Sequence, residues 1–336
     1  MAKEVTLADI AEKVGVSKVA VSKALSGKPG VSDELREKIK QIAQQTGYVS
    51  RASKTTEYTG NIGVIVPEHY YGYSISFYGQ LYEKVVKALY NNSYYGILEL
   101  LTKEDEAAGK IPKVIEDRKV DGVIFLGQID EKYIVKMINH TRLPVYFLDT
   151  YVPDIEFDTV ISDGYYGTYM LTNYLINQGF KKIGFIGSVD ATSSIADRYW
   201  GYRRALREKN IKYDESWEVP DRDKKGKSLD RVLSKDNLLP AYVCNCDYTA
   251  HLVMQELDKN GIKVPEDVSL VGFDNFIPLG LGMDADKITT YEVDMNLLAE
   301  ACVKSLIKKI KHIKYNSGIQ IITGRIVVKK SVRQCN

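Results

Sequence analysis

The chain has 336 residues, of which 44% are hydrophobic and 27% charged, and a formal net charge of +2. This length suffices for a small module plus one large or two medium domains, and the composition is that of an ordinary globular protein. The near-neutral charge excludes nucleic-acid binding driven by the charge of the whole molecule, so such a function needs a local basic patch.

The N-terminal sequence and the cysteine count predict the compartment. Charged residues interrupt the N-terminus every few positions, whereas a signal peptide needs an apolar run, and no apolar stretch is long enough to span a membrane. Four cysteines in a chain of this length do not form a disulfide framework, which agrees with a reducing environment. We therefore expect a cytoplasmic protein without membrane contact.

The first predicted elements are two short helices joined by a tight turn. Apolar residues recur every three or four positions in TLADIAEKV, residues 6–14, which predicts a helix capped by Thr6 with Asp9 as its reciprocal partner. Gly15 ends this helix, and Ser17 caps a second one. Two helices joined so closely cannot lie antiparallel, so we expect the steep crossing of a helix-turn-helix.

A third predicted helix begins at Ser32 and covers the other two with its apolar residues. On the second helix, Val21, Ala24 and Leu25 can face this core, which leaves small polar, basic and aliphatic residues pointing outward. In a helix-turn-helix, the N-terminal end of the second helix enters the major groove. The outward residues at that end are Ser17, Lys18, Val19, Ser22 and Lys23.

These outward residues suit duplex DNA. Serine hydroxyls donate to phosphate oxygens, Lys18 and Lys23 reach guanine edges or phosphates, and Val19 can contact a thymine methyl group. Residues 1–60 carry ten Lys and Arg against seven Asp and Glu, which is a modest basic excess. The alternative interpretation is a three-helix packing module whose lysines are only solvated.

Residues 5–48 resemble the DNA-binding headpiece of the LacI/GalR repressor family, through the series T-x-x-D-I-A, G-V-S, V-S, L-x-G, V-S and G-Y. Ala20 stands where the family commonly has Thr, so we expect one backbone contact to be missing. The resemblance implies that bases are read by Lys18, Val19 and Lys23, and that phosphates are contacted by Ser17 and Ser22. The full predicted DNA-binding set is Thr6, Ser17, Lys18, Val19, Ser22, Lys23, Ser26 and Arg51.

The predicted linker, residues 49–60, departs from the pattern of the family. Family members typically continue with Pro-Asn and an A-R-x-L hinge helix, whose Leu wedges into the minor groove. This chain reads VSRASKTTEYTGN, which contains neither Pro nor Leu. Because kinking DNA needs an apolar wedge to offset the unstacking of bases, we expect less bending of DNA than is usual in the family.

From residue 61 onward, short β-rich runs alternate with helical stretches, which predicts parallel sheets covered by helices on both faces. The segment VISDGYYG, near residue 162, breaks the series, so an α/β core of two doubly wound parallel-sheet subdomains is favoured over one sheet. The predicted domains are a small all-α helix-turn-helix domain at 1–48, a linker at 49–60 and an effector-binding and dimerisation core at 61–336. Within that core we expect subdomains at about 61–161 and 162–288, with a segment crossing between them at 289–336.

Ligands of such sheets bind outside the carboxyl ends of the strands, where this sequence places carboxylates, an arginine and aromatic residues. Carboxylates accept hydrogen bonds from vicinal hydroxyls, arginine donates several, and aromatic faces cover the C–H side of a sugar ring. The alternative is that each Asp only caps the following helix. The predicted effector-binding set is Tyr73, Phe77, Gln128, Asp149, Asp163, Arg198, Trp200, Asp247 and Asp274.

The motifs D-R-Y-W-G-Y-R-R-A-L and P-E-D-V-S-L-V-G-F-D-N also resemble the LacI/GalR family, in its periplasmic-binding-protein-like core. By position, Asp149, Arg198 and Asp274 match residues that contact effectors in the family. Cys246 precedes Asp247 where the family commonly has Asn, and a thiol hydrogen-bonds poorly, so one sugar contact is in question.

Two other chemistries fit these residues less well. The Cys244-Asn245-Cys246 stretch near His251 could hold a metal, but a buried strand explains both thiols. Paired carboxylates could make a glycosidase, yet a DNA-binding headpiece gives hydrolysis no evident purpose. We therefore predict no catalytic residue, cofactor or metal.

A single headpiece makes few phosphate contacts, so we expect a homodimer on a palindromic operator in double-stranded DNA, with helices at 76–92 and 247–260 as candidate interfaces. A sugar-like effector between the subdomains would control a transcriptional repressor. A nucleobase-responsive regulator of the same architecture is the main alternative. A sugar-binding transport protein without DNA binding is the second, although it would lack residues 1–48 and carry an export signal.

Overall fold

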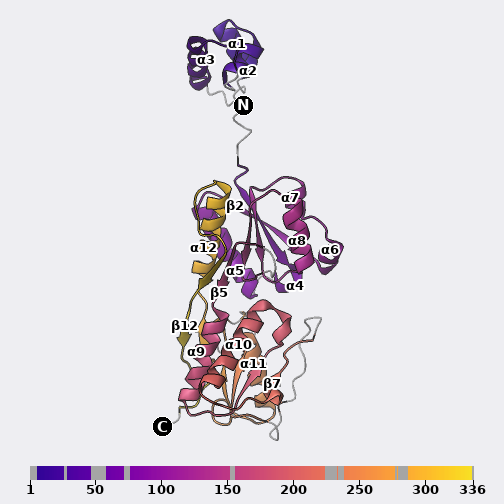
Figure 1. Ribbon diagram of the computed structural model, residues 1–336, viewed down its shortest axis with the longest axis vertical. Helices are drawn as coiled ribbons and strands as arrows, with labels where there is room; N and C mark the ends of the chain where they lie inside the picture. The colour runs from indigo at the N-terminus through magenta and orange to yellow at the C-terminus, as the bar shows by residue number, and fades with distance from the viewer. Residues whose placement is uncertain are drawn as a thin grey trace. The chain divides into compact units, whose positions relative to one another are not determined.

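The computed structural model describes residues 6–25, 29–46, 58–71, 76–151, 156–223, 233, 238–276, 278 and 287–334 (Figure 1). The chain divides into two compact units, Met1–Thr59 and Gly60–Asn336.

The first unit packs three short helices around a small apolar core. Ile10, Val21 and Ile39, one from each helix, are fully buried in this core. Burying them removes apolar area from water, which is the main stabilising contribution available to so small a unit. The helices are α1 (Leu7–Val14), α2 (Lys18–Leu25) and α3 (Asp33–Gln45).

The caps of these helices follow the predicted pattern. The Asp9 carboxylate accepts hydrogen bonds from the N–H of Thr6 at 2.7 Å and from its hydroxyl at 2.6 Å. Gly15 ends α1 in the left-handed conformation, at φ 77°, which costs a glycine little. The Ser17 hydroxyl accepts the N–H of Ala20 at 3.2 Å at the start of α2. The chain can therefore turn between two helices within three residues.

The second unit contains two parallel sheets with helices on both faces, which confirms the predicted fold class. The six-stranded sheet has the order β11-β5-β4-β3-β1-β2, and the four-stranded sheet has the order β7-β6-β8-β9. Strands of the first are β1 (Asn61–Pro67), β2 (Tyr95–Leu101), β3 (Gly122–Leu126), β4 (Val145–Leu148), β5 (Thr159–Ser162) and β11 (Ile319–Ile322). Strands of the second are β6 (Ile183–Ile186), β7 (Glu218–Val219), β8 (Ala241–Cys244) and β9 (Ser269–Val271).

Helices cover both faces of these sheets because successive strand residues, which point to opposite faces, are apolar. In β1, Val64 packs into one buried cluster and its neighbour Ile65 into another, so both faces of the sheet are covered. The longer helices of the core are α5 (Phe77–Asn91), α8 (Glu131–His140), α9 (Gly164–Asn177), α10 (Ser193–Glu208), α11 (Asp247–Lys259) and α12 (Met295–Ile310). The shorter ones are α4 (Glu68–Tyr71), α6 (Lys103–Ala108), α7 (Lys113–Glu116) and the 3₁₀ turns η2 (Val189–Ala191) and η3 (Glu215–Trp217).

The segment that was expected to break the chain near residue 162 contains a strand. Residues 159–162 form β5, which pairs with β4 on one side and β11 on the other. A strand of four residues is too short to show a pattern of its own, and its partner β11 lies far ahead in the sequence. The chain leaves the first subdomain directly after this strand, at α9.

The C-terminal segment connects the two subdomains. Strand β10 (Thr290–Glu292) pairs with β12 (Arg325–Val327) beside the second sheet, whereas α12 packs on α5 and β11 joins the first sheet. Figure 1 shows this segment, in yellow, running alongside both subdomains. Each passage of the chain between the subdomains lies near the carboxyl ends of parallel strands, where ligands of such sheets bind.

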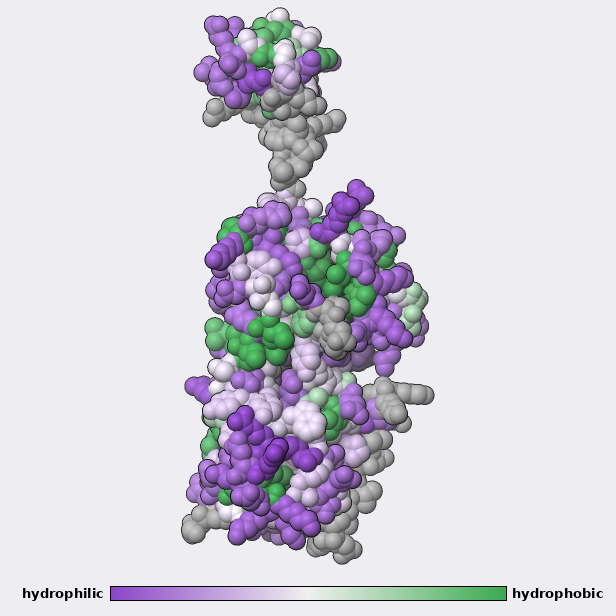
Figure 2. Space-filling model, viewed as in Figure 1, coloured by the Kyte–Doolittle hydropathy of each residue, from purple (hydrophilic) through white to green (hydrophobic). Residues whose placement is uncertain are grey.

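The outer surface is mixed in character. Figure 2 shows hydrophobic side chains as separate patches among hydrophilic ones on the face that it draws. None of the helices in the described ranges is long and apolar enough to cross a bilayer.

Candidate functional site

Helix α2 presents its predicted DNA-reading side chains to solvent. Lys18, Ser22 and Lys23 are exposed, and Val19 keeps 64% of its surface exposed although it is apolar. Val21 and Ala24 point the other way, into the core. The structure therefore separates the packing residues of α2 from those available to a duplex.

A side chain that sequence reasoning missed positions the end of α2. The Arg36 guanidinium, on α3, donates from one nitrogen to the carbonyls of Ala24 at 3.1 Å and Lys23 at 3.4 Å. These are carbonyls of the last turn, which lack partners within the helix. Of the remaining predicted DNA contacts, Thr6 is exposed at the start of α1. Ser26 and Arg51 lie outside the described residues.

At the junction of the core subdomains, Arg198 of α10 is buried and held from two sides. One terminal nitrogen donates to the Asn245 carbonyl at 2.6 Å, and the other donates to the Asp274 carboxylate at 2.9 Å. The guanidinium lies 4.0 Å from the centroid of the Phe273 ring. The Nε atom of Arg198 is buried and has no hydrogen-bond partner within the described ranges, so a donor remains unused.

Asp149, from the other subdomain, joins this group. It follows β4 in the left-handed conformation, at φ 60°, and its carboxylate accepts a hydrogen bond from the Tyr78 hydroxyl at 2.9 Å. Burial raises the pKa of Asp149 to about 6, although Arg198 and Tyr78 oppose this shift. Burial likewise raises the pKa of Asp274, against Arg198. We call Tyr78, Asp149, Arg198 and Asp274 the Arg198 cluster.

Asp247 holds the loop that follows β9 and carries Asp274 of this cluster. Its side chain is buried, and one carboxylate oxygen accepts the N–H of Phe276 at 2.9 Å, which fixes the loop after β9. The other oxygen lies only 2.0 Å from where a side-chain carbon of residue 272 would stand, so Gly272 is required there. Burial raises the pKa of Asp247 well above its usual value, and Asp274 adds to the shift. Asp247 thus neither caps α11 nor faces solvent.

Contacts also bridge the two subdomains. The Gln128 side-chain oxygen, after β3, accepts the N–H of Ser193 at the start of α10 at 3.2 Å. The Tyr151 hydroxyl donates to Asp197 of α10 at 3.2 Å. Phe77 of α5 and Phe276 of the second subdomain meet edge to face, with ring centroids 6.0 Å apart. Polar and aromatic groups from both sides therefore converge at one place.

Two predicted effector residues are not part of this group. Trp200 is 55% exposed and faces away from Arg198, because two positions along a helix turn a side chain by roughly 200°. The structure therefore does not bring Trp200 to the Arg198 cluster. Asp163 caps α9, where it accepts the N–H of Tyr166 at 2.9 Å, as the alternative interpretation expected. Tyr73 lies outside the described residues.

Comparison with known proteins agrees with both units. Residues 6–50 match the family described as bacterial regulatory proteins, lacI family, and residues 172–332 match the periplasmic binding protein-like domain. The HTH-type transcriptional regulator RegA of Clostridium saccharobutylicum is 28% identical over 97% of this chain and 98% of its own length. The chain belongs to the LacI family.

Solved structures show the same fold. The transcriptional regulator CelR in complex with cellobiose aligns with a TM-score of 0.68 at 21% identity, covering 98% of this chain and all of that one. The lac repressor dimer bound to operator and an anti-inducer aligns with a TM-score of 0.65 at 19% identity, covering 98% and 99%. This LacI-family protein is a DNA-binding transcriptional regulator with a periplasmic-binding-protein-like core.

The LacI-family regulator has junction residues that sequence reasoning missed. Tyr78 lies one position after Phe77, within an aromatic run whose individual roles the sequence does not distinguish. The Asp221 carboxylate accepts hydrogen bonds from the Ser188 N–H and the Asn245 side chain, both at 2.8 Å, and pairs with Arg222 at 2.7 Å. No periodic signal marked this stretch, because it follows a strand of only two residues.

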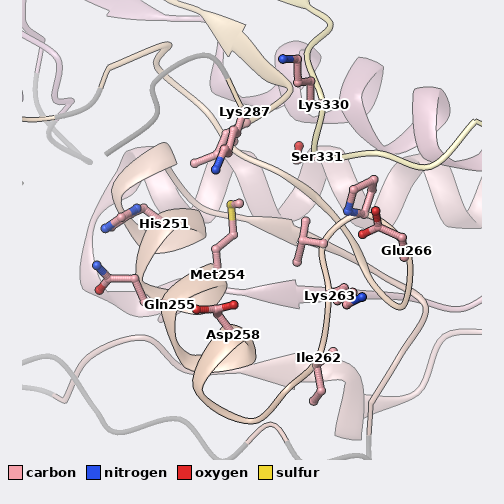
Figure 3. Close-up of a pocket in the computed structure, with 13 residues that line it drawn as sticks. His251, Met254, Gln255, Asp258, Ile262, Lys263, Glu266, Lys287, Lys330 and Ser331 are labelled. Atoms are coloured by element: carbon pink, nitrogen blue, oxygen red, sulfur yellow. The ribbon is translucent and has the colours of Figure 1, made fainter. Parts of the chain in front are cut away.

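A separate hollow of about 660 Å³ borders the exposed face of α11 in the second subdomain. Figure 3 shows Met254 at its centre, between Lys287 and Asp258, with Glu266 on the facing loop. Nearby, Cys244 is buried in β8. No group of three His, Cys, Asp or Glu residues is placed to hold a metal ion in the part of the chain that the structure describes.

Proposed function

We propose that this LacI-family regulator is a cytoplasmic repressor that binds a palindromic operator as a homodimer, under the control of a small sugar-like effector held between the core subdomains. The observation that carries the effector proposal is the buried, unused Nε–H of Arg198 between carboxylates from both subdomains. Operator and effector binding are then linked, so each changes the affinity for the other by the same factor.

The Arg198 cluster supports a polyhydroxylated ligand. A hydroxyl group both donates and accepts, so vicinal hydroxyls can accept from Arg198 and donate to Asp149 or Asp274. Because burial raises the pKa of Asp149 to about 6, a ligand hydroxyl that donates to its carboxylate replaces water that the fold has removed. The solved structure of CelR is a complex with cellobiose, which supports a sugar here.

Aromatic rings support the second candidate, a nucleobase. Phe77 and Phe276 meet across the junction, and Tyr70 packs on Tyr78 with centroids 5.1 Å apart. Such faces cover the C–H side of a sugar, yet they equally stack on a planar base. Calorimetric titration with mono- and oligosaccharides, nucleobases and sugar phosphates separates the two. Saturable binding of a neutral sugar supports the proposal, whereas binding of a nucleobase alone overturns the sugar assignment.

Two surfaces support the homodimer, one at the end of α5 and the start of β2, and one beside α11. Tyr90 at the end of α5 is 72% exposed, and neighbouring Tyr95 is 68% exposed. Met254 lines the hollow beside α11 (Figure 3). Met254 is only partly buried, and aromatic and Met side chains at the surface are typical of the cores of protein interfaces. The lac repressor was solved as a dimer bound to its operator, which supports the same assembly here.

Sedimentation of Tyr90→Glu and Met254→Glu tests the dimer. We expect monomers, with operator affinity reduced because two headpieces no longer bind together. Ile313→Glu, at a residue that is 53% exposed on neither of these surfaces, is the matched control and should remain dimeric. Variants that all sediment as the unaltered chain does would overturn these interfaces.

A further inference from the structure

The outward face of α10 carries one tryptophan and three arginines. The arginines follow the tryptophan by three, four and seven positions, a spacing that places all four side chains on one side of the helix. A core-facing helix would place apolar residues at these positions, whereas this side lines a surface hollow of about 920 Å³. Its lining includes Trp200, Arg203, Arg204 and Arg207 of α10, Tyr165 of α9, and Lys212 beyond α10.

Two of the arginines are already held in place by aromatic rings. The Arg203 guanidinium lies 3.3 Å from the centroid of the Tyr213 ring. Arg204 lies over Tyr169 at 5.2 Å and donates to Glu208 at 2.8 Å. An arginine fixed in this way has lost much of its conformational freedom before any ligand arrives, which lowers the entropic cost of binding.

The hollow has an excess of positive charge and an exposed ring. Its lining contains four cationic side chains and one carboxylate, Glu208, which Arg204 pairs. Arg207 and Lys212 form no ion pair or hydrogen bond with any residue that the structure describes. Trp200 keeps 55% of its surface exposed. The Trp200 ring meets the Tyr199 ring edge to face, with centroids 5.0 Å apart, and more than half of its surface still remains exposed.

We propose that this surface, the α10 hollow, binds a small ligand with a planar aromatic ring and two or more phosphate groups, such as a nucleoside polyphosphate. Trp200 supplies a face for the ring, and arginine forks match phosphate oxygens in pairs. The volume lies in the range of about 300–1,000 Å³ that holds small ligands. The lining of the α10 hollow contains no member of the Arg198 cluster, and Trp200 lies on the opposite side of α10 from Arg198, so the two sites are distinct.

Fluorescence of Trp200 tests the proposal directly. The chain has two tryptophans, so Trp217→Phe leaves Trp200 as the single reporter. We expect ATP to change this fluorescence saturably, and adenosine and tripolyphosphate to bind at least about tenfold more weakly. No saturable change with ATP would overturn the site. Equal affinity for adenosine would overturn the role of charge, and equal affinity for tripolyphosphate would overturn the role of the ring.

Charge reversal locates the ligand. In the Trp217→Phe chain, we expect Arg207→Glu with Lys212→Glu to weaken ATP binding by about tenfold or more. Lys181→Glu, which reverses an exposed lysine of the same subdomain outside the hollow, should leave the affinity unchanged. Circular dichroism checks that all three chains are folded. If the double variant binds ATP as tightly as the Trp217→Phe chain does, the ligand binds elsewhere and the proposal is overturned.

Discussion

The exposed face of α2 and the Arg198 cluster are built in opposite ways. The side chains of the α2 face come from one short helix, and the core that holds them lies within the first forty-odd residues. The members of the Arg198 cluster are separated in sequence by as many as 196 positions, from Tyr78 to Asp274, and meet only where two sheets end. Local periodicity therefore reveals the first surface, whereas topology assembles the second.

Removal of residues 1–50 is expected to have the largest effect, and it tests whether DNA binding and effector binding belong to different regions. We expect the shortened chain to lose detectable retardation of a palindromic operator, selected in vitro from random duplexes, because the whole α2 face is gone. Effector binding measured by calorimetry should remain, because the Arg198 cluster lies in the other unit. A shortened chain that retards the operator as well as the intact chain does would refute the assignment of the α2 face.

Arg198→Ala tests the Arg198 cluster. We expect effector binding to disappear and the free energy of unfolding to fall by about 3–5 kcal/mol, because Asp274 is left buried and unpaired. Operator binding without effector should remain measurable in a gel-shift assay. Lys304→Ala, which removes an exposed partner of Glu300, is the matched control. Loss of operator binding with effector binding intact would reverse the assignment.

Asp149→Asn tests how the stability of the Arg198 cluster depends on pH. The pKa of Asp149 is about 6 in the folded chain against an ordinary 3.8, so the folded state binds the proton more tightly. The contribution of Asp149 to stability is therefore present at low pH and is lost as pH rises from about 4 to about 6. Above pH 6 the variant should be more stable than the unaltered chain by about 2–3 kcal/mol, and near pH 4 the two should converge.

Denaturant unfolding at several pH values measures this difference. Asp190→Asn, at an exposed carboxylate of the second subdomain, should show no such pH-dependent gain. A loss of stability in Asp149→Asn that grows as pH rises would mean that the charged carboxylate is favourable in the fold, and a difference that does not change with pH would mean that the pKa is not shifted. Either result would contradict the prediction.

Lys18→Ala examines a single base-reading side chain. We expect operator affinity to fall by about 1–3 kcal/mol, with relaxed selection at one base pair in each half-site. Lys40→Ala, on α3 and paired with Glu37 at 2.6 Å, should change affinity little. Uniform weakening on every sequence would instead make Lys18 a phosphate contact.

The smallest effect concerns the predicted linker, residues 49–60. Without a Leu or Pro in this stretch, we expect a circular-permutation assay to show a weaker central bend than an intercalating wedge produces. A sharp kink at the centre of the operator would show that another side chain supplies the wedge.

The sequence by itself determined the headpiece and the alternation of the core. Caps at Thr6 and Ser17, the break at Gly15 and the helix period are interactions between near neighbours, which a linear pattern records. It also placed Asp149, Arg198 and Asp274 after strands or on helices that reach the junction.

Tertiary structure decided which of these residues meet. It put Trp200 on the opposite side of α10 from Arg198, turned Asp247 into a support for a loop, and added Tyr78 and Arg36, which no spacing had marked. The short strands β5 and β11 became a pair although some 160 residues separate them. Contacts between distant segments depend on how sheets stack and where the chain crosses, and the period of a single element carries no information about either.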